Sequence, residues 1–164
     1  MIVLKNILVA TDFSEPSENA LNYGRDLARS YAATLHVLHV TENILMRYTP
    51  EIGVAVPDFQ AELDRLARQE LDRRITADEM RSLKVVPALE SAINPAAAIV
   101  DYARTHEIDL IVVGTHGRGA MQHLFMGSVA ERVVRTAPCP VLAVRAHGRE
   151  FIAPDAVAAR QAPR

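Results

Sequence analysis

The chain has very little cysteine, almost no net charge and no long hydrophobic run, and each shortage excludes a class of protein. Cys139 is the only cysteine among 164 residues, so an internal disulfide is excluded. The formal net charge of −2 gives no whole-molecule attraction for nucleic acids or acidic membranes. No segment approaches the ~20 consecutive apolar residues that cross a membrane. We therefore expect neither a nucleic-acid partner nor a membrane partner.

The N-terminal segment is apolar, yet it lacks the features of a secretion signal. Lys5 and Asn6 interrupt the apolar stretch, Asp12 follows it, and no small-residue cleavage site is present. We expect this segment to form a first strand, and we expect the protein in the cytoplasm. The hydrophobic content of 49% and the charged content of 23% are typical of an ordinary globular domain.

Apolar runs rich in β-branched residues alternate with helical patterns along the chain, which predicts an α/β fold with a parallel sheet and helices on both faces. The expected strands are Asn6–Thr11, Thr34–Val40, Lys84–Glu90, Asp109–Gly114 and Val141–Arg145. The expected helices are Glu15–Ala33, Asp58–Ala77, Pro95–His106 and Ser128–Ala137. These elements form one expected domain, residues 1–146. Residues 147–164 lack a sustained period, so we expect a flexible C-terminal tail.

The second expected helix, Asp58–Ala77, is amphipathic. An apolar stripe is expected to face the sheet and consists of Phe59, Leu63, Leu66 and Leu71. A basic set mixed with acids is expected on the solvated face and consists of Arg65, Arg68, Arg73 and Arg74. The preceding segment 41–57 has no clear pattern, and a loop of this length is uncommon in a compact domain unless it covers something.

The segment from Gly114 to Ser128 is the most informative part of the chain. It begins where an apolar strand ends, is rich in glycine, and finishes where an amphipathic helix begins. Glycines let a backbone approach an anion closely, and the unpaired N–H groups of a first helical turn point at it. The spacing differs from a P-loop and from the dinucleotide motif G-x-G-x-x-G. The segment predicts a phosphate-binding loop.

Two residues beside this loop each allow a structural and a functional interpretation. Asp12 ends an apolar strand, where it could bind ribose hydroxyls or a water on a phosphate-bound Mg²⁺. It could equally accept backbone N–H groups at the entrance of the first helix, next to the expected N-cap Ser14. Ser128 and Glu131 have the spacing of a capping box, which would occupy the serine without excluding phosphate contact.

The histidines do not form a metal site by their spacing. His116 and His123 have no acid or cysteine at a suitable distance in the sequence to complete a ligand set. His36 and His39 fall on opposite faces of one expected strand, so they do not form a pair. Cys139, between two prolines, is expected to be a small packing residue rather than a reactive thiol.

Gly114, Gly117, Gly127 and Ser128 match a pattern of the ATP-binding branch of the universal stress protein family, which the chain resembles. That pattern is Gly, two residues, Gly, nine residues, Gly, then Ser or Thr. The resemblance extends from about Lys5 to Arg145. One departure lies before Pro95, where members often carry glycine and this chain carries asparagine. The family implies a Rossmann-like, doubly wound sheet of five parallel strands in the order 3-2-1-4-5.

The resemblance also implies ATP, with Mg²⁺ reached from Asp12 through water, as the ligand. The residues that it places around the nucleotide are Ala10, Thr11, Asp12, Val40, Gly114, His116, Gly117, Arg118, Gly127, Ser128 and Val129. Val40, Ala10 and Thr11 belong to the adenine side. In an open doubly wound sheet such a site lies beyond the carboxyl ends of the strands, where the winding reverses.

The resemblance implies a stress-response regulator with an unidentified protein partner, and a homodimer formed by the last strand. The strand residues concerned are Val141, Leu142, Ala143 and Val144. No catalytic constellation is present in the sequence, so we expect no dedicated enzyme activity and at most slow ATP hydrolysis. Two alternatives stay open: a dimerisation module that binds no nucleotide, and a weak ATPase or adenylating enzyme of the same α/β group. Such enzymes carry a Ser-Gly-Gly loop where this chain has Thr11-Asp12-Phe13-Ser14.

Overall fold

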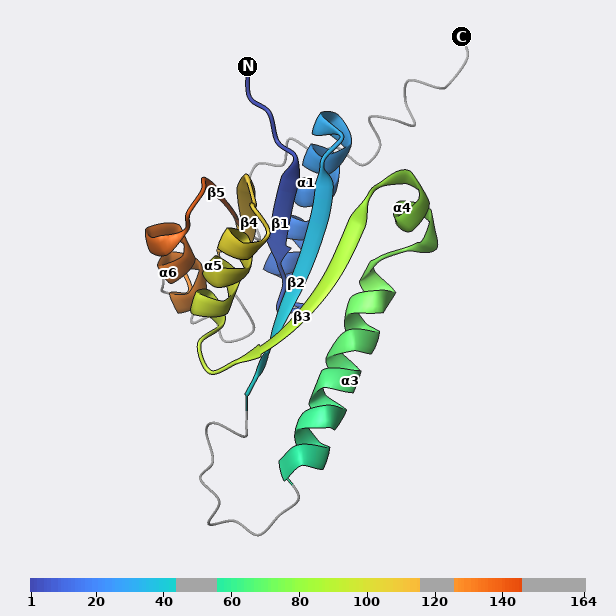
Figure 1. Ribbon diagram of the computed structural model, residues 1–164, viewed down its shortest axis with the longest axis vertical. Helices are drawn as coiled ribbons and strands as arrows, with labels where there is room; N and C mark the ends of the chain where they lie inside the picture. The colour runs from blue at the N-terminus through green and yellow to red at the C-terminus, as the bar shows by residue number, and fades with distance from the viewer. Residues whose placement is uncertain (44–55, 116–125, 146–164) are drawn as a thin grey trace.

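The computed structural model describes residues 1–43, 56–115 and 126–145, in which a central sheet is flanked by helices (Figure 1). The strands are β1 (Asn6–Ala10), β2 (Thr34–Glu42), β3 (Val85–Ala92), β4 (Leu110–Gly114) and β5 (Val141–Val144). The helices are α1 (Glu15–Tyr31), α3 (Val56–Arg74), α4 (Ala77–Ser82), α5 (Pro95–Thr105) and α6 (Ser128–Thr136). All strand pairs are parallel, and the order β3-β2-β1-β4-β5 confirms the expected topology.

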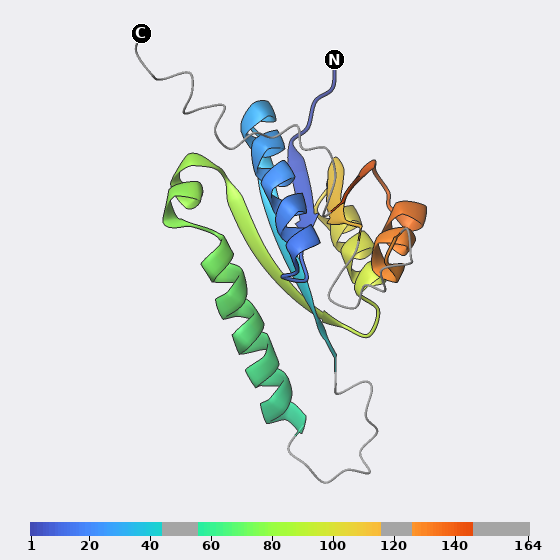
Figure 2. The same cartoon turned by 180° about the vertical axis from the view of Figure 1, so that it is seen from behind.

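The helices cover both faces of the sheet, as the alternating pattern predicts. Figures 1 and 2 show α5 and α6 on one face and α1 on the other, with α3 running along β2 and β3. Leu21 of α1 and Leu71 of α3 are buried in one cluster against Ile7 and Val9 of β1. The second cluster joins residues of α5 and α6 to the opposite face of the strands. Burial on both sides explains why the central strands are almost continuously apolar.

The expected helix 58–77 is confirmed as α3, but α3 ends at Arg74, and the short helix α4 that follows was not predicted. Thr76 is the N-cap of α4: its hydroxyl accepts the Glu79 N–H at 3.2 Å, and the Glu79 carboxylate accepts the Thr76 N–H at 2.8 Å. This reciprocal capping box satisfies two N–H groups that a new helix would otherwise leave open. The Thr76–Glu79 spacing is visible in the sequence, and it marks the start that the helical periodicity did not show.

The face of α3 that packs on the sheet also differs from the expected apolar stripe. Phe59 is 58% exposed and Leu66 is 48% exposed, whereas Gln60, Ala67 and Leu71 are buried. The buried positions recur at the spacing of one helical face, but one of them is polar. The expected stripe is therefore confirmed at Leu71 and wrong at Phe59 and Leu66, which are exposed.

Hydrogen bonds compensate for the cost of burying polar side chains between α3 and the sheet. Asp64 accepts the Thr41 hydroxyl at 2.8 Å and the Gln60 side-chain amide at 3.0 Å. Gln60 also donates to the Ser91 hydroxyl at 3.3 Å. Burying a polar group costs free energy unless it finds a partner, so these contacts fix one seating of α3 at the end of β2.

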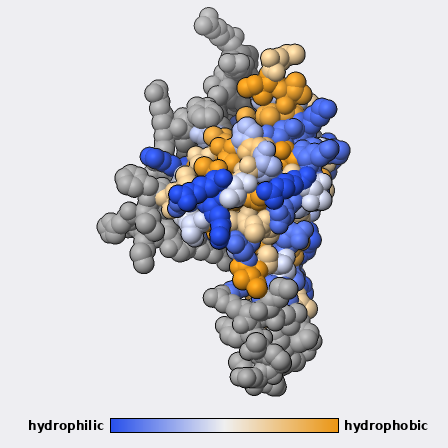
Figure 3. Space-filling model, turned by 60° about the vertical axis from the view of Figure 1, so that its left-hand side comes forward, coloured by the Kyte–Doolittle hydropathy of each residue, from blue (hydrophilic) through white to orange (hydrophobic). Residues whose placement is uncertain are grey.

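The surface seen from the side of β5 and α6 mixes hydrophobic residues with charged ones (Figure 3). The exposed hydrophobic side chains include Ile2 and Val3 before β1, and Val129 and Val134 of α6. None of the helices within the described ranges is long and apolar enough to cross a membrane.

Candidate functional site

The candidate site lies at the carboxyl ends of β1 and β4, which are neighbours at the centre of the sheet. Ala10 of β1 pairs with Val113 of β4 and with Leu38 of β2. Asp12 and Thr115 each lie two residues beyond the Ala10–Val113 pair, so both loops leave the sheet at the same level. The chain winds from β1 towards β2 and β3 on one side, and continues through β4 and β5 on the other. This is the point of reversal at which doubly wound sheets bind ligands.

The two described ends of the predicted phosphate loop meet through the backbone. The Gly127 N–H donates to the Thr115 carbonyl at 2.7 Å, and the Thr115 N–H donates to the Val144 carbonyl at 2.7 Å. These bonds hold the start of α6 against the carboxyl end of β4. His116, Gly117 and Arg118 lie outside the described residues, so their predicted contacts stay predictions.

The capping box expected at Ser128 is wrong, because the N-cap of α6 is Gly127. Ser128 is already the first helical residue, and its N-cap Gly127 has no side chain that could cap the helix. The first backbone bond of the helix runs from the Glu131 N–H to the Gly127 carbonyl at 2.9 Å. Ser128 and Val129 are exposed, and no described residue accepts their N–H groups. An exposed first turn of this kind is suited to an anion.

Gly114 is required by packing rather than by a turn. A Cβ atom at this position would lie 2.8 Å from the carbonyl carbon and oxygen of Pro16, and 3.0 Å from the Ser17 nitrogen. No glycine within the described residues has a positive φ. The missing side chain lets the first turn of α1 rest on the end of β4, which brings the loop before α1 to the site.

Asp12 takes the structural role that its sequence position allowed. Its Oδ1 accepts the Ser14 N–H at 3.1 Å and the Ser14 hydroxyl at 2.5 Å. Ser14 is the N-cap of α1, as expected, but its side chain makes no capping bond to the helix. The hydroxyl turns back to Asp12 instead. The Asp12 carboxylate is half-buried, and the local role leaves its charge at the carboxyl end of β1.

Thr11 is buried and holds the loop from within. Its hydroxyl lies 3.1 Å from the Ser17 hydroxyl and accepts the Phe13 N–H at 3.1 Å. Its carbonyl lies 2.8 Å from Nδ1 of His39 on β2. The backbone of Thr11 can therefore line a site, whereas its side chain shapes the loop.

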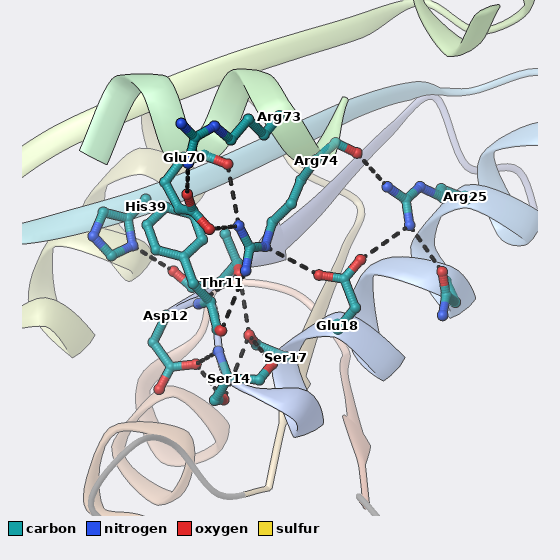
Figure 4. A network of polar contacts seen from close by, with 12 residues as sticks. Thr11, Asp12, Ser14, Ser17, Glu18, Arg25, His39, Glu70, Arg73 and Arg74 are labelled. Atoms are coloured by element: carbon teal, nitrogen blue, oxygen red, sulfur yellow. Dashed lines mark hydrogen bonds and ion pairs between the residues drawn. The ribbon is translucent and has the colours of Figure 1, made fainter. Parts of the chain in front are cut away.

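The sequence analysis did not predict that His39 and Arg74 would contact Phe13 beside Asp12. Phe13 has a φ of 65°, which places it in the left-handed region. Its ring stacks on His39 with 4.1 Å between the ring centroids, and Cζ of Arg74 lies 4.6 Å from the Phe13 centroid. Figure 4 shows His39, Arg74 and the Asp12 loop together, although they come from β2, α3 and the segment after β1. Arg74 was assigned to the solvated face of its helix, and an aromatic residue directly after Asp12 was the available signal.

The apolar side of the site lies at the ends of β1 and β2. Ala10 and Val40 are half-buried and pack at the margin of the cluster under α5 and α6, as does Met126 beside the start of α6. Thr41, the next residue on β2, is buried and bound to α3. The site therefore combines apolar residues at one side with Asp12 and the α6 N-terminus at the other.

The remaining titratable residues set limits on the chemistry. Burial raises the pKa of the Cys139 thiol, and the Asp109 carboxylate raises it further, so this thiol is not activated. His36 points to the opposite face from His39 and lies 3.0 Å from the Tyr102 hydroxyl. Among the described residues, no group of histidine, cysteine and acidic side chains could hold a metal ion directly.

The chain is similar to known proteins in sequence and in fold. Residues 4–145 match the model of the universal stress protein family. A universal stress protein of Thermus aquaticus is 36% identical over 146 residues, which cover 87% of this chain and 100% of that protein. The structure of universal stress protein UspA from Lactobacillus plantarum is 28% identical with a TM-score of 0.79, covering 88% of this chain and 100% of that one.

Two further structures share the fold at lower identity. One is a universal stress protein in complex with cAMP, 23% identical with a TM-score of 0.60 over 89% of this chain and 100% of that one. The other, from Archaeoglobus fulgidus, is in complex with dAMP and is 22% identical with a TM-score of 0.58, over 88% of this chain and 99% of that one. The chain belongs to the universal stress protein family.

Proposed function

We propose that this protein binds ATP, with Mg²⁺, and acts in the cytoplasm as a nucleotide-dependent regulator of a stress response. The observation that carries the proposal is the Gly127–Thr115 hydrogen bond of 2.7 Å, which holds the exposed start of α6 at the same end of the sheet as Asp12. Complexes of this fold with cAMP and dAMP support an adenine nucleotide as the ligand class.

The residues present fit such a ligand in three parts. Val40 and Ala10, with the Thr11 backbone, offer a half-buried apolar wall for adenine. The N–H groups of Ser128 and Val129 and the Ser128 hydroxyl face outward from a helix N-terminus and would receive phosphate. Asp12 would hold ribose hydroxyls or a water of Mg²⁺, which usually keeps several waters in protein sites.

The proposal assigns the protein to binding rather than to catalysis. The contacts of the site that the structure describes include one hydroxyl–carboxylate pair, Ser14 with Asp12, at the entrance of α1. The Asp12 Oδ1 is engaged by Ser14, which leaves it poorly suited to activate an attacking water. We propose that any ATP hydrolysis is slow and that the nucleotide state controls stability or the choice of a protein partner.

We also propose that the protein forms a homodimer through β5. This strand is at the edge of the five-stranded sheet, and among the described strands it pairs with β4 alone. An apolar edge strand with open N–H and C=O groups is a template for another strand. A second copy offers the same strand and would satisfy both edges at once.

Thermal unfolding with and without saturating Mg-ATP tests the nucleotide proposal, with Gly127→Val as the comparison. Gly127 has a φ of −69°, which valine can adopt, so the variant should fold. Ligand at ~100 times its dissociation constant adds about 2.7 kcal/mol, which should raise the midpoint of the wild type by roughly 5–10 °C. We expect the variant to lose most of that increase.

The same experiment separates the alternatives. Protein shown to be free of nucleotide that gains no stability from Mg-ATP would leave the dimerisation module as the better interpretation. A gain accompanied by release of pyrophosphate would favour an adenylating enzyme instead. Parallel titrations with cAMP would show which adenine nucleotide the site prefers.

A further inference from the structure

Arg74 and His39 both contact the ring of Phe13, the residue that follows Asp12. We propose that Arg74, at the end of α3, is a positioning residue for Asp12, and that it couples the nucleotide site to the α3–α4 corner through Phe13. This inference rests on the proposed nucleotide function. It adds Arg74 and helix α3 to the parts of the protein that affect nucleotide binding, and the glycine motif includes neither.

Phe13 needs support from its surroundings to keep its backbone conformation. A φ of 65° is unfavourable for a bulky residue that has a Cβ atom. Both backbone polar groups of Phe13 are engaged: the N–H donates to the Thr11 hydroxyl at 3.1 Å, and the carbonyl accepts Nη2 of Arg74 at 3.4 Å. Phe13 lies directly between Asp12 and Ser14, which bonds the Asp12 carboxylate. The direction of that carboxylate therefore depends on the backbone of Phe13.

The Phe13 ring is held by two contacts, one with an aromatic ring and one with a cation. The His39 ring stacks on it at 4.1 Å between centroids with an interplanar angle of 23°. The Arg74 guanidinium lies over the ring at 4.6 Å from its centroid. A guanidinium over an aromatic face is attracted by the ring quadrupole. Arg74 thus contacts Phe13 through the ring and through the carbonyl.

Arg74 is itself fixed by contacts to two helices, as Figure 4 shows. Its Nε lies 3.1 Å from the Glu18 carboxylate of α1, and its Nη1 pairs with Glu70 one turn earlier on α3. Its side chain is only 21% exposed. Lysine cannot reproduce these contacts, because they use the separate nitrogens of one planar group.

Arg25 of α1 extends the connection to α4. It donates from Nη2 to the Arg74 carbonyl at 2.6 Å, and its Nε lies 2.5 Å from the Glu79 carboxylate. A displacement of the α3–α4 corner would therefore pull on Arg74 and, through it, on Phe13. Coupling of this kind is reciprocal, so a ligand that orders the Asp12 loop would also stabilise the seating of the corner.

The first test compares Arg74→Met with Arg73→Met in calorimetric titrations with Mg-ATP. Arg73 is the matched control, because it leaves the same turn of α3, pairs with the same Glu70 and is 75% exposed. We expect Arg74→Met to raise the dissociation constant on the order of tenfold, since it removes hydrogen bonds to a charged group. Arg73→Met should leave it within about twofold, as expected for an exposed ion pair. Equal affinities for both variants would overturn the inference.

The second test measures backbone hydrogen exchange at Ser14 in protein without nucleotide, below the unfolding midpoint of each variant. Arg74→Met should accelerate exchange at Ser14 and Arg73→Met should not, because only Arg74 holds the loop. Unchanged exchange would overturn the positioning role. Faster exchange in a protein that binds no ATP at all would uphold the positioning role and overturn the nucleotide function alone.

A double-mutant cycle with Phe13→Leu asks whether Arg74 acts through Phe13. If it does, the combined variant should bind Mg-ATP about as weakly as the weaker single variant, because contacting residues are not additive. Arg74→Lys keeps the positive charge but not the planar guanidinium group. Its affinity for Mg-ATP should lie between those of the wild type and Arg74→Met. Additive losses would show that Arg74 affects the site by another route and would overturn the inference.

Discussion

Gly114 shows how the absence of one side chain brings two elements of the site together. A methyl group at this position would lie 2.8 Å from the carbonyl of Pro16, and backbone atoms there cannot rotate away. We expect Gly114→Ala to lower the free energy of unfolding by about 1–3 kcal/mol, as overpacking does. Urea unfolding without nucleotide measures this loss. An unchanged free energy would show that α1 can move off β4 without cost.

The charge of Asp12 can be separated from its structural role. Asp12→Asn keeps an oxygen that can accept the Ser14 N–H, so the loop should hold its shape. It removes the negative charge that would orient a water of Mg²⁺. We expect similar thermal unfolding without ligand, and binding of Mg-ATP that is weaker on the order of tenfold, as for a lost charged hydrogen bond. Unaltered binding would leave Asp12 with its structural role only.

His36 should make the stability depend on pH. Burial lowers its pKa below 6.5, and the nearby charges of His106 and Lys84 lower it further. The unfolded histidine takes up its proton near pH 6.5, whereas the folded one does so only at lower pH. The stability contributed by neutral His36 is therefore complete above pH 6.5 and is lost as the pH falls towards the folded pKa.

Urea unfolding of wild type and His36→Gln at pH 8 and pH 5 measures this effect. Glutamine does not titrate, yet it can still exchange a hydrogen bond with the Tyr102 hydroxyl. We expect acidification to cost the wild type more free energy of unfolding than the variant. The same loss in both proteins would contradict a titration of His36.

At the scale of elements, α3 shows which part of the fold the sequence could not predict. Its length and helical pattern were visible, but its orientation about its own axis was not. The buried face includes Gln60 and Asp64, which are normally solvated, and their partners Thr41 and Ser91 lie on other elements. Only the tertiary contacts show that this polar face is the inner one. Arg74 was missed for the same reason, because it lies on that face.

Two leucines of α3 test this orientation with the same substitution. Leu71 is fully buried beneath the helix, whereas Leu66 is 48% exposed. We expect Leu71→Ala to lower the free energy of unfolding by about 2–5 kcal/mol. Leu66→Ala should change it by no more than about 0.5 kcal/mol, as surface substitutions usually do. Denaturant unfolding of the two variants gives the comparison, and equal losses would contradict the observed face.

At the scale of the whole molecule, the alternation of strands and helices predicted the parallel sheet with two covered faces. The strand order came from the resemblance carried by Gly114, Gly127 and Ser128, and the structure confirms it. The motif also predicts one wall of the candidate site, at Gly127 and Ser128, and this stays a prediction. It could not identify His39 or Arg74, because their role comes from contacts with Phe13 across long stretches of chain.

The edge of the sheet provides the last prediction, which concerns the homodimer. The Ile111 N–H donates to the Pro140 carbonyl, and the Thr115 N–H donates to the Val144 carbonyl. Because backbone groups alternate in direction along a strand, Val141 and Ala143 turn their N–H groups to the open edge. Ala143→Pro therefore removes a donor from that edge and none from the ladder with β4.

We expect Ala143→Pro to convert a dimer to a monomer without unfolding it, since proline is tolerated where an edge N–H faces outward. Sedimentation velocity gives the mass of each protein, and circular dichroism shows whether the variant is folded. A proline in a helix, such as Ala98→Pro, cannot serve as the control for folding. It would remove the Ala98 N–H that donates to the Asn94 carbonyl in the first turn of α5. The matched control is Val141→Thr, which keeps the outward N–H and the β-branched shape. A folded variant at position 143 that stays dimeric would show that the two copies meet through another surface.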